Sequence, residues 1–395
     1  MLLKLDYPIG FQFVKAIPAP SSNNNVWDLG DLAPGAEYNI SVTGKLLDVS
    51  DGEEKNFKVW SGSQSSSDKS SIGVVFNSAE HIVAIKKSSI EAKLIVNGES
   101  QREYAINTKS SIQGQIQWKN NLETKINNLE IRAKIYGNAV DTKTISVKSG
   151  FYNSAENSIV WDRNSVSKFI EINPGDSGSV SFSFSPLSLF SAVNGMIFSP
   201  TVNVDISIVG KQSDGNGEIT EISNSESKII RIISDLGLST KVLYYSGSFT
   251  NTGPIPPKVE QKTTYTVVWS LSNTANNISK AEIRSTLPSW VQFVGKFSPA
   301  PEDLTYNASS REIIWNVGVV PKGTNITEKE KEVSFQIEFS PSLSQAGTMP
   351  VLINSTTLTG YDDFANVDIK VNKVSLNTRL LNDIGFPVQG GIVVE

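Results

Sequence analysis

The sequence predicts an all-β protein made of tandem β-sandwiches, the first of them incomplete, and three observations favour this fold class. Short runs rich in Val, Ile, Thr and Phe alternate with polar residues and recur about every 10 to 15 residues, with turn residues between them. Helical periodicity is convincing nowhere along the chain. One strand–turn–strand pattern also occurs three times at wide intervals, which indicates an array of similar modules.

The repeated pattern joins a tryptophan-containing strand to a turn that contains Pro and Gly. Its copies read VWDLGDLAPG at 26–35, IVWDRNSV followed by INPG within 159–175, and IIWNVGVVPKG at 313–323. The β-branched residues favour a pleated strand, Pro fixes φ, and Gly supplies the backbone freedom that a turn needs. Each copy is therefore expected to form two antiparallel strands joined at the rim of a sandwich, with the tryptophan closing the first strand.

Five tryptophans fall where strand alternation points a side chain inward, and we expect them to fill the sandwich cores. A buried indole contributes on the order of a few kcal/mol through its large apolar area. These core candidates are Trp27, Trp118, Trp161, Trp269 and Trp315.

The spacing of landmark residues gives the length of a module. Trp161 follows Trp27 by 134 residues, and Trp315 follows Trp161 by 154 residues. A strand ends at Asn120, 41 residues before Trp161, and another ends at Asn273, 42 residues before Trp315. One module therefore takes about 130 to 155 residues, and two whole modules can be superposed on these landmarks.

The same spacing predicts three parts. The asparagine landmark of the first module would lie ahead of Met1, so residues 1–85 are expected to be the second half of a module, with an open sheet edge. Met1 is then expected to be a fragment boundary or an internal start, with further modules or an anchor upstream. Residues 86–235 and 236–395 are expected to be complete modules, the last of them ending in two edge strands at 367–375 and 390–395.

The individual strands follow from period-2 alternation between turn signals. A Ser-rich tract at 61–71 is expected to be a long hairpin loop, and one short helical turn is expected within 185–196. The strands expected in chain order are 7–16, 38–46, 56–60 and 74–76, then 91–98, 112–118, 129–137, 144–150, 158–162, 179–186, 201–211 and 228–234, and finally 236–247, 264–271, 281–288, 289–295, 313–315, 331–341 and 356–364.

Composition excludes several classes of function. The net charge of −5 is thinly spread and lacks clustered Lys or Arg, so we expect no nucleic-acid partner. The absence of cysteine excludes a thiol nucleophile, a Cys-ligated zinc and an iron–sulfur cluster. The single histidine, His81, has no second histidine to work with and is given a structural role. No run of 18 apolar residues occurs, so no membrane span is expected in this chain.

Calcium is the only cofactor with any support in the sequence, and that support is weak. One acidic cluster, at 214–218, alternates its oxygen ligands but lacks the continuation of an EF-hand loop. A second lies in YDDF at 361–364, and a solvated turn explains each of them as well. The candidate ligands are Asp214, Asn216, Glu218, Asp362 and Asp363.

The last module resembles the DUF11-type surface repeat, an immunoglobulin-like module of bacterial cell-surface proteins. The resemblance rests on YTVVWSLSN at 265–273, on a Leu-Pro followed by a Val and a Phe within 287–293, and on the tryptophan strand with its Pro-x-Gly turn. Residues 10–35 match the second half of the same pattern, whereas the middle module lacks the Leu-Pro element. The resemblance implies an extracellular structural or adhesive role at the cell surface and supplies no catalytic residues.

Two functions from different classes are compatible with these observations. In the first, the chain is a non-enzymatic stalk or spacer, since short turns leave little room for a catalytic cleft. In the second, an adhesin-type module binds a surface glycan or a protein through strand edges or exposed aromatics. An exposed Trp290 with Tyr361 nearby would favour binding, and burial of every tryptophan would favour the spacer. We favour the spacer, and the aromatic candidates for the alternative are Tyr244, Tyr245, Trp290 and Tyr361.

Overall fold

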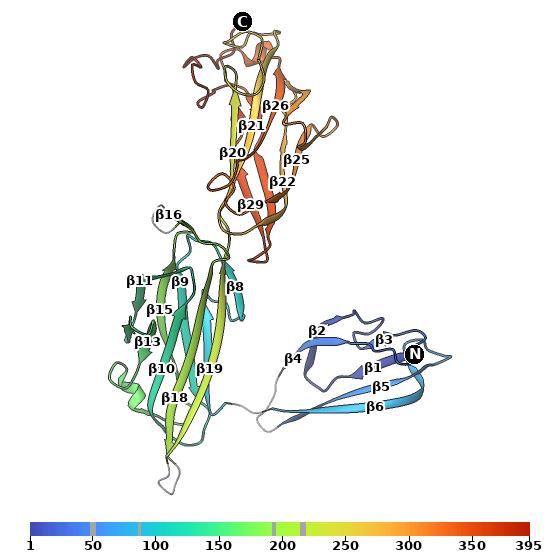
Figure 1. Ribbon diagram of the computed structural model, residues 1–395, viewed down its shortest axis with the longest axis vertical. Coiled ribbons are helices and arrows are strands. Elements are labelled where there is room, and N and C mark those ends of the chain that lie inside the picture. Colours follow the sequence, from blue (N-terminus) through green and yellow to red (C-terminus); the bar gives the residue numbers. More distant parts are fainter. Residues whose placement is uncertain (48–52, 86–87, 192–194, 214–218) are drawn as a thin grey trace. The chain divides into compact units, whose positions relative to one another are not determined.

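The structure is a computed structural model, and it describes residues 1–47, 53–85, 88–191, 195–213 and 219–395. The protein is all-β and consists of tandem β-sandwiches, as predicted (Figure 1). The helical segments in the described ranges are two 3-10 turns, η1 (Ser167–Ile170) and η2 (Leu343–Gln345). In the part of the chain that the structure describes, no helix is long and apolar enough to cross a membrane. Two compact units are distinguished: Met1–Glu91 with Asn120–Glu123, and Ala92–Lys119 with Thr124–Glu395.

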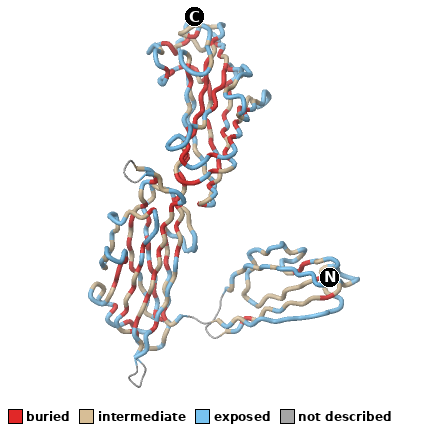
Figure 2. Tube along the Cα trace, viewed as in Figure 1, coloured by how far each residue is buried: buried red, intermediate tan, exposed pale blue. Residues whose placement is uncertain are grey.

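The first unit has a four-stranded sheet in the order β3-β1-β5-β6 and a two-stranded sheet of β2 and β4. Its buried hydrophobic side chains, among the residues described up to position 85, are those of Leu2, Val26 and Trp27. Figure 2 shows how few buried residues this unit has compared with the other. Its strands are β1 (Leu2–Asp6), β2 (Phe11–Ile17), β3 (Val26–Asp28), β4 (Ser41–Leu46), β5 (Glu54–Gln64) and β6 (Ile72–Ala84).

The second unit begins with a sandwich that contains Trp118 and Trp161. One sheet has the order β12-β13-β10-β18-β19-β8, with β14 also paired to β10, and the other has the order β11-β15-β9-β7. Burial alternates strictly along β9 and β18, as expected for strands with one face on a core. The strands are β7 (Ile90–Val96), β8 (Glu103–Ile106), β9 (Ile112–Asn120), β10 (Ile126–Tyr136), β11 (Val140–Val147), β12 (Phe151–Asn153), β13 (Ser158–Trp161), β14 (Glu171–Ile172), β15 (Ser177–Pro186), β16 (Phe190–Ser191), β17 (Gly195–Met196), β18 (Thr201–Ser213) and β19 (Ile219–Ile232).

A further sandwich follows in the same unit. The sheets β20-β21-β26-β23 and β24-β25-β22-β28-β29 enclose one apolar core that includes Tyr265, Trp269 and Trp315. The strands are β20 (Leu236–Leu243), β21 (Thr263–Asn273), β22 (Ile278–Thr286), β23 (Val291–Ser298), β24 (Asp303–Asn307), β25 (Glu312–Val320), β26 (Lys331–Phe339), β27 (Val351–Ile353), β28 (Thr356–Asp362), β29 (Val367–Lys373) and β30 (Leu376–Asn377).

Four expectations about elements need correction. Trp315 does not close its strand, because β25 continues to Val320 through an irregular pairing with β22. The Ser-rich loop is shorter than predicted, since β5 runs on to Gln64 and β6 begins at Ile72. Within 185–196, where a helical turn is expected, Phe190–Ser191 and Gly195–Met196 instead pair as β16 and β17. Residues 390–395 form a single bridge, from Val394 to Lys258, rather than an edge strand.

Candidate functional site at the joint of two sandwiches

The connection between the two sandwiches of the second unit is short, and its middle residue is buried. Strand β19 ends at Ile232 and β20 begins at Leu236, so three residues join them. The middle one, Ser234, is only 4% exposed. Its hydroxyl donates to the Asn273 side-chain oxygen at 2.6 Å and accepts the backbone N–H of Ala275 at 2.8 Å. The connector is therefore bound to the loop that follows β21.

A buried carboxylate fixes the same connector from the other side. Asp362, at the end of β28, is fully buried and accepts the backbone N–H of Ser234 at 2.9 Å. The backbone N–H groups of Phe364 and Ala365 donate to its second oxygen at 3.0 and 2.8 Å. The Asn276 side-chain amide also donates to Asp362, at 3.0 Å. Four N–H donors thus surround one buried negative charge, which is the arrangement that makes its burial tolerable.

The Asn276 amide also reaches the last residue of the preceding sandwich. Its nitrogen donates to the backbone carbonyl of Ile232 at 3.0 Å, in addition to its bond to Asp362. One side chain of the last sandwich therefore links the end of β19 to the end of β28. Hydrogen bonds inside a low-dielectric site hold one another in a defined arrangement.

Asn273, the landmark that ends β21, anchors the Pro-x-Gly turn next to this joint. Its fully buried side-chain amide donates to the carbonyls of Asn276, Val320 and Pro321 at 2.7, 3.1 and 3.0 Å. The backbone N–H of Gly323 completes the turn by donating to the Thr274 carbonyl at 2.8 Å. Two features recognised in the sequence by their spacing, the asparagine and the proline turn, therefore lie in contact here.

Cationic side chains brace the joint at its surface. Arg231 of β19 donates to the Phe364 carbonyl at 2.9 Å, lies 5.5 Å from the Phe364 ring and pairs with Glu103 at 2.8 Å. The Lys322 ammonium lies 4.5 Å from the centre of the Phe198 ring, which belongs to the other sandwich. Cation–π contacts of this kind contribute about 0.5–1 kcal/mol at exposed sites. The joint therefore combines buried hydrogen bonds with a charged rim.

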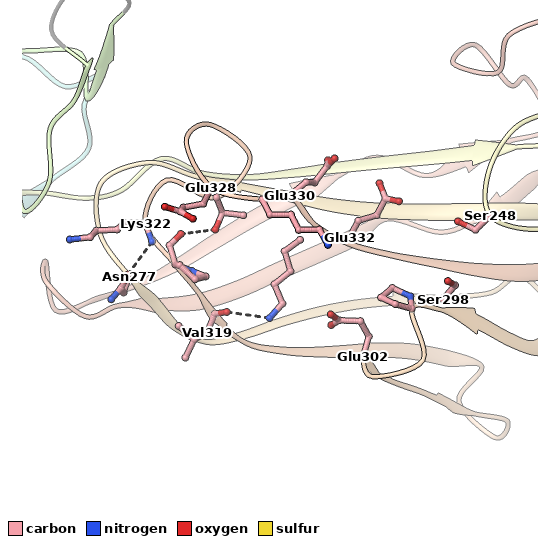
Figure 3. A pocket seen from close by; sticks show the side chains of 14 residues that line it. Ser248, Asn277, Ser298, Glu302, Val319, Lys322, Glu328, Glu330 and Glu332 are labelled. Carbon is pink, nitrogen blue, oxygen red and sulfur yellow. Dashed lines mark hydrogen bonds between the residues drawn. The ribbon is translucent and has the colours of Figure 1, made fainter.

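An open groove of about 820 Å³ lies on the last sandwich, beside β25 and β26. Figure 3 shows the carboxylates of its lining spread along the groove rather than directed at one point. The Lys331 ammonium already donates to the Val317 and Val319 carbonyls, at 2.9 and 3.3 Å. Partial burial, with the Glu330 charge adding to it, raises the pKa of Glu332, and Lys241 opposes this shift. Across the described ranges, no three His, Cys, Asp or Glu side chains are placed to hold a metal ion.

The structure separates the sequence-derived calcium candidates. Asp214, Asn216 and Glu218 lie outside the described residues. Asp362 points into the joint, whereas the exposed Asp363 accepts the Ser279 hydroxyl at 2.6 Å. The two adjacent carboxylates therefore serve different partners and do not form one site.

The structure also separates the two main aromatic binding candidates. Trp290 is 39% exposed and its indole N–H donates to the Val351 carbonyl at 2.8 Å. Tyr361 pairs with Ser279 at the start of β22, whereas Trp290 lies beyond Thr286 at the other end of that strand. At about 3.3 Å per residue, the strand places roughly 20 Å between them. They do not share a surface, so the exposed pair that would favour binding is not found. The burial of every tryptophan, which would favour the spacer, is not found either, because Trp290 is exposed.

The other aromatic candidates lie elsewhere. Tyr245 is 54% exposed, and the backbone N–H groups of Tyr244 and Tyr245 both donate to Asp383, at 2.7 and 2.8 Å. The tryptophans assigned to cores are at most 4% exposed: Trp27, Trp118, Trp161, Trp269 and Trp315.

The three repeated tryptophans each make a hydrogen bond of the same kind, from the indole N–H to a residue earlier in the chain. The indole N–H groups of Trp161 and Trp315 each donate to a residue 13 positions earlier, Lys148 at 3.0 Å and Glu302 at 2.8 Å. That of Trp27 donates to the Pro18 carbonyl at 3.0 Å. Each ring is thereby fixed to a preceding loop as well as packed in a core.

Of the residues that make the joint, the sequence pattern marks Asn273 as the end of a strand and Asp362 as a calcium candidate, but it does not indicate the joint itself. No motif in the sequence points to Ser234, Arg231 or Asn276. The available signal was the cluster of Ser, Asp, Asn and Thr at the strand ends near 234 and 273, residues that readily bond to backbone groups.

No protein-family model matches the chain, and no curated protein matches it. The resemblance to the DUF11-type repeat therefore stays a prediction. Among solved structures, the chain is similar to the C-terminal domain of the Streptococcus pyogenes antigen I/II-family protein AspA, with 11% identity and a TM-score of 0.26 over 73% of this chain and 100% of that one.

Two more solved structures have the same low level of similarity. The Streptococcus agalactiae AgI/II polypeptide BspA C-terminal domain has 10% identity and a TM-score of 0.25, over 73% of this chain and 99% of that one. The seventh ScaB type I cohesin from Pseudobacteroides cellulosolvens has 14% identity and a TM-score of 0.21, over 36% and 92% of the two chains. Likeness at this level does not bear on function, which we argue from the joint.

Proposed function

We propose that this chain is a non-enzymatic structural array, a stalk or spacer of a bacterial cell-surface protein, exposed outside the cell. The observation that carries the proposal is the buried polar joint around Ser234 and Asp362. Domain boundaries usually fall in exposed, flexible linkers crossed by few contacts. Here the middle residue of the connector, Ser234, is buried and bonded to the sandwich that follows it, as a spacer that holds its modules in a fixed arrangement requires.

The energetics of the joint support a restrained connection. A hydrogen bond to a charged group contributes about 1.5–3 kcal/mol, and a buried donor left without its acceptor costs about 1–3 kcal/mol. Moving the connector away breaks the bonds that Ser234 makes with Asp362, Asn273 and Ala275, so several buried groups lose their partners at once. The joint therefore favours one arrangement of the two sandwiches of the second unit over many.

A distance measurement on the full chain tests the proposal. The chain has no cysteine, so Lys211→Cys combined with Lys296→Cys places one spin label on each sandwich of the second unit. Both lysines are exposed. We expect pulsed electron paramagnetic resonance to give one narrow distance distribution, as narrow as that of the matched pair Lys296→Cys and Lys370→Cys within the last sandwich. A broad distribution for the first pair alone would refute the spacer function.

The exposure of Trp290 favours a second candidate, an adhesin-type module that binds a glycan by stacking on this indole. The spacer proposal predicts no saturable binding of the full chain to a glycan array, with or without calcium. Trp290→Ala should then give the same signal as the unaltered chain. Selective binding that Trp290→Ala reduces tenfold or more would instead establish the adhesin function.

A further inference from the structure

The outer edge of β6 in the first unit has no partner strand among the described residues. β6 spans Ile72–Ala84 and pairs along one side with β5. It is the last strand in the order β3-β1-β5-β6. A free edge presents a row of unpaired N–H and C=O groups, and proteins usually protect long edges with charge, proline or bulges.

The side chains of β6 make this edge unusually apolar. Val74, Val75, Phe76 and Ile82 are 60, 50, 64 and 50% exposed. Because successive residues of a strand point to opposite faces, apolar groups lie on both faces of this edge. The only acid of the strand, Glu80, is occupied by the β5 side chains that bond to it: the Asn56 amide at 3.0 Å and the Lys58 ammonium at 3.5 Å.

Another edge strand carries several charged side chains, whereas β6 carries only Glu80 and two irregular steps in its pairing with β5. β29 forms the edge of its sheet and carries Asp368, Lys370 and Lys373 within seven residues. β6 is 13 residues long and contains neither lysine, arginine nor proline. Its irregular pairing with β5 is confined to the stretch before Asn77, and the remainder up to Ala84 pairs regularly. The contrast indicates that the edge of β6 is available to pair with another strand.

We propose that β6 pairs with β6 of a second copy of this chain, antiparallel about a two-fold axis at Ala79. An antiparallel strand edge is complementary to itself, and a two-fold interface uses the same patch on both copies. This register sets Phe76 opposite Ile82, Val75 opposite Val83 and Val74 opposite Ala84. It sets Glu80 opposite Ser78, whereas an axis at Glu80 would bring two like charges together, which is unfavourable.

The oligomeric state of the full chain tests the pairing. We expect analytical ultracentrifugation to show a concentration-dependent dimer, and Val75→Lys to weaken it about tenfold or more by placing a charge in the interface. Val14→Lys is the matched control, because Val14 on β2 is 51% exposed and lies outside β6. Far-ultraviolet circular dichroism establishes that both variants fold. A monomer at all concentrations, or equal weakening by both variants, would overturn the proposal.

A cross-link tests the register independently. In this cysteine-free chain, Ala79→Cys supplies a single exposed thiol on the proposed axis, and we expect mild oxidation to give a disulfide-linked dimer at low micromolar protein. Ala155→Cys, in an exposed turn of another sandwich, should remain monomeric under the same conditions. No preference for Ala79→Cys over Ala155→Cys would contradict pairing through this edge. Neither substitution touches the joint, so the outcome is independent of the spacer function.

Discussion

Replacing Trp315 with alanine is expected to lower the free energy of unfolding of the last sandwich by about 3–5 kcal/mol. The indole is fully buried in the core that it shares with Trp269 and Phe335. Its removal leaves a large cavity and also leaves the Glu302 carboxylate without the indole N–H that it accepts at 2.8 Å. Hydrogen exchange of β22 and β25 in the full chain measures the change for this sandwich alone.

The matched control for Trp315→Ala is Trp290→Ala in the same sandwich. Trp290 is 39% exposed, so its loss should cost much less than that of Trp315. Equal effects of the two substitutions would show that the core is not organised around Trp315.

Replacing Asp362 with alanine is expected to release the joint. Four N–H donors lose their acceptor, and each buried donor left unpaired costs about 1–3 kcal/mol, so the total loss should be at least about 3 kcal/mol. The spin-label pair across the joint should then give a broad distance distribution, and β20 should exchange its amide protons faster.

Two further variants separate the joint from a general loss of stability. Asp363→Ala removes the adjacent exposed carboxylate, whose partner is the Ser279 hydroxyl, and should leave the distance distribution narrow. Asp362→Asn keeps one acceptor oxygen and should give an intermediate result. A narrow distribution in Asp362→Ala would show that this carboxylate does not hold the joint.

The fold could be predicted because alternation and turn chemistry are local. Strict alternation along Ile112–Asn120 and Thr201–Ser213 was visible in the sequence, and it appears in the structure as alternating burial. The error at Trp315 has a physical cause. Asn316 and Gly318 looked like a turn, yet Gly318 adopts φ +75° at an irregular step of the β22–β25 pairing, and the strand continues past it.

The joint could not be predicted because its members are far apart in the chain. Ser234 meets Asp362 across 128 positions, and Asn273 meets Pro321 across 48. Only the register of β21, β25 and β28 brings these residues together. The adjacent acids at 362 and 363 looked equivalent in the sequence, but the end of β28 turns one carboxylate inward and leaves the other in solvent.

The pairing of β19 also determines how this chain would respond to mechanical tension. A pull transmitted through Leu236 reaches the preceding sandwich at the end of β19, which is paired with β18 from Thr201 to Ser213 and with the parallel strand β8. Antiparallel ladder bonds run perpendicular to the strands, so a force along β19 loads them together rather than one after another. Shear of this kind is resisted by all the hydrogen bonds of the ladder. Where the force enters, at the end of β19, Arg231 and Ser234 are also bonded to Phe364 and Asp362 of the last sandwich.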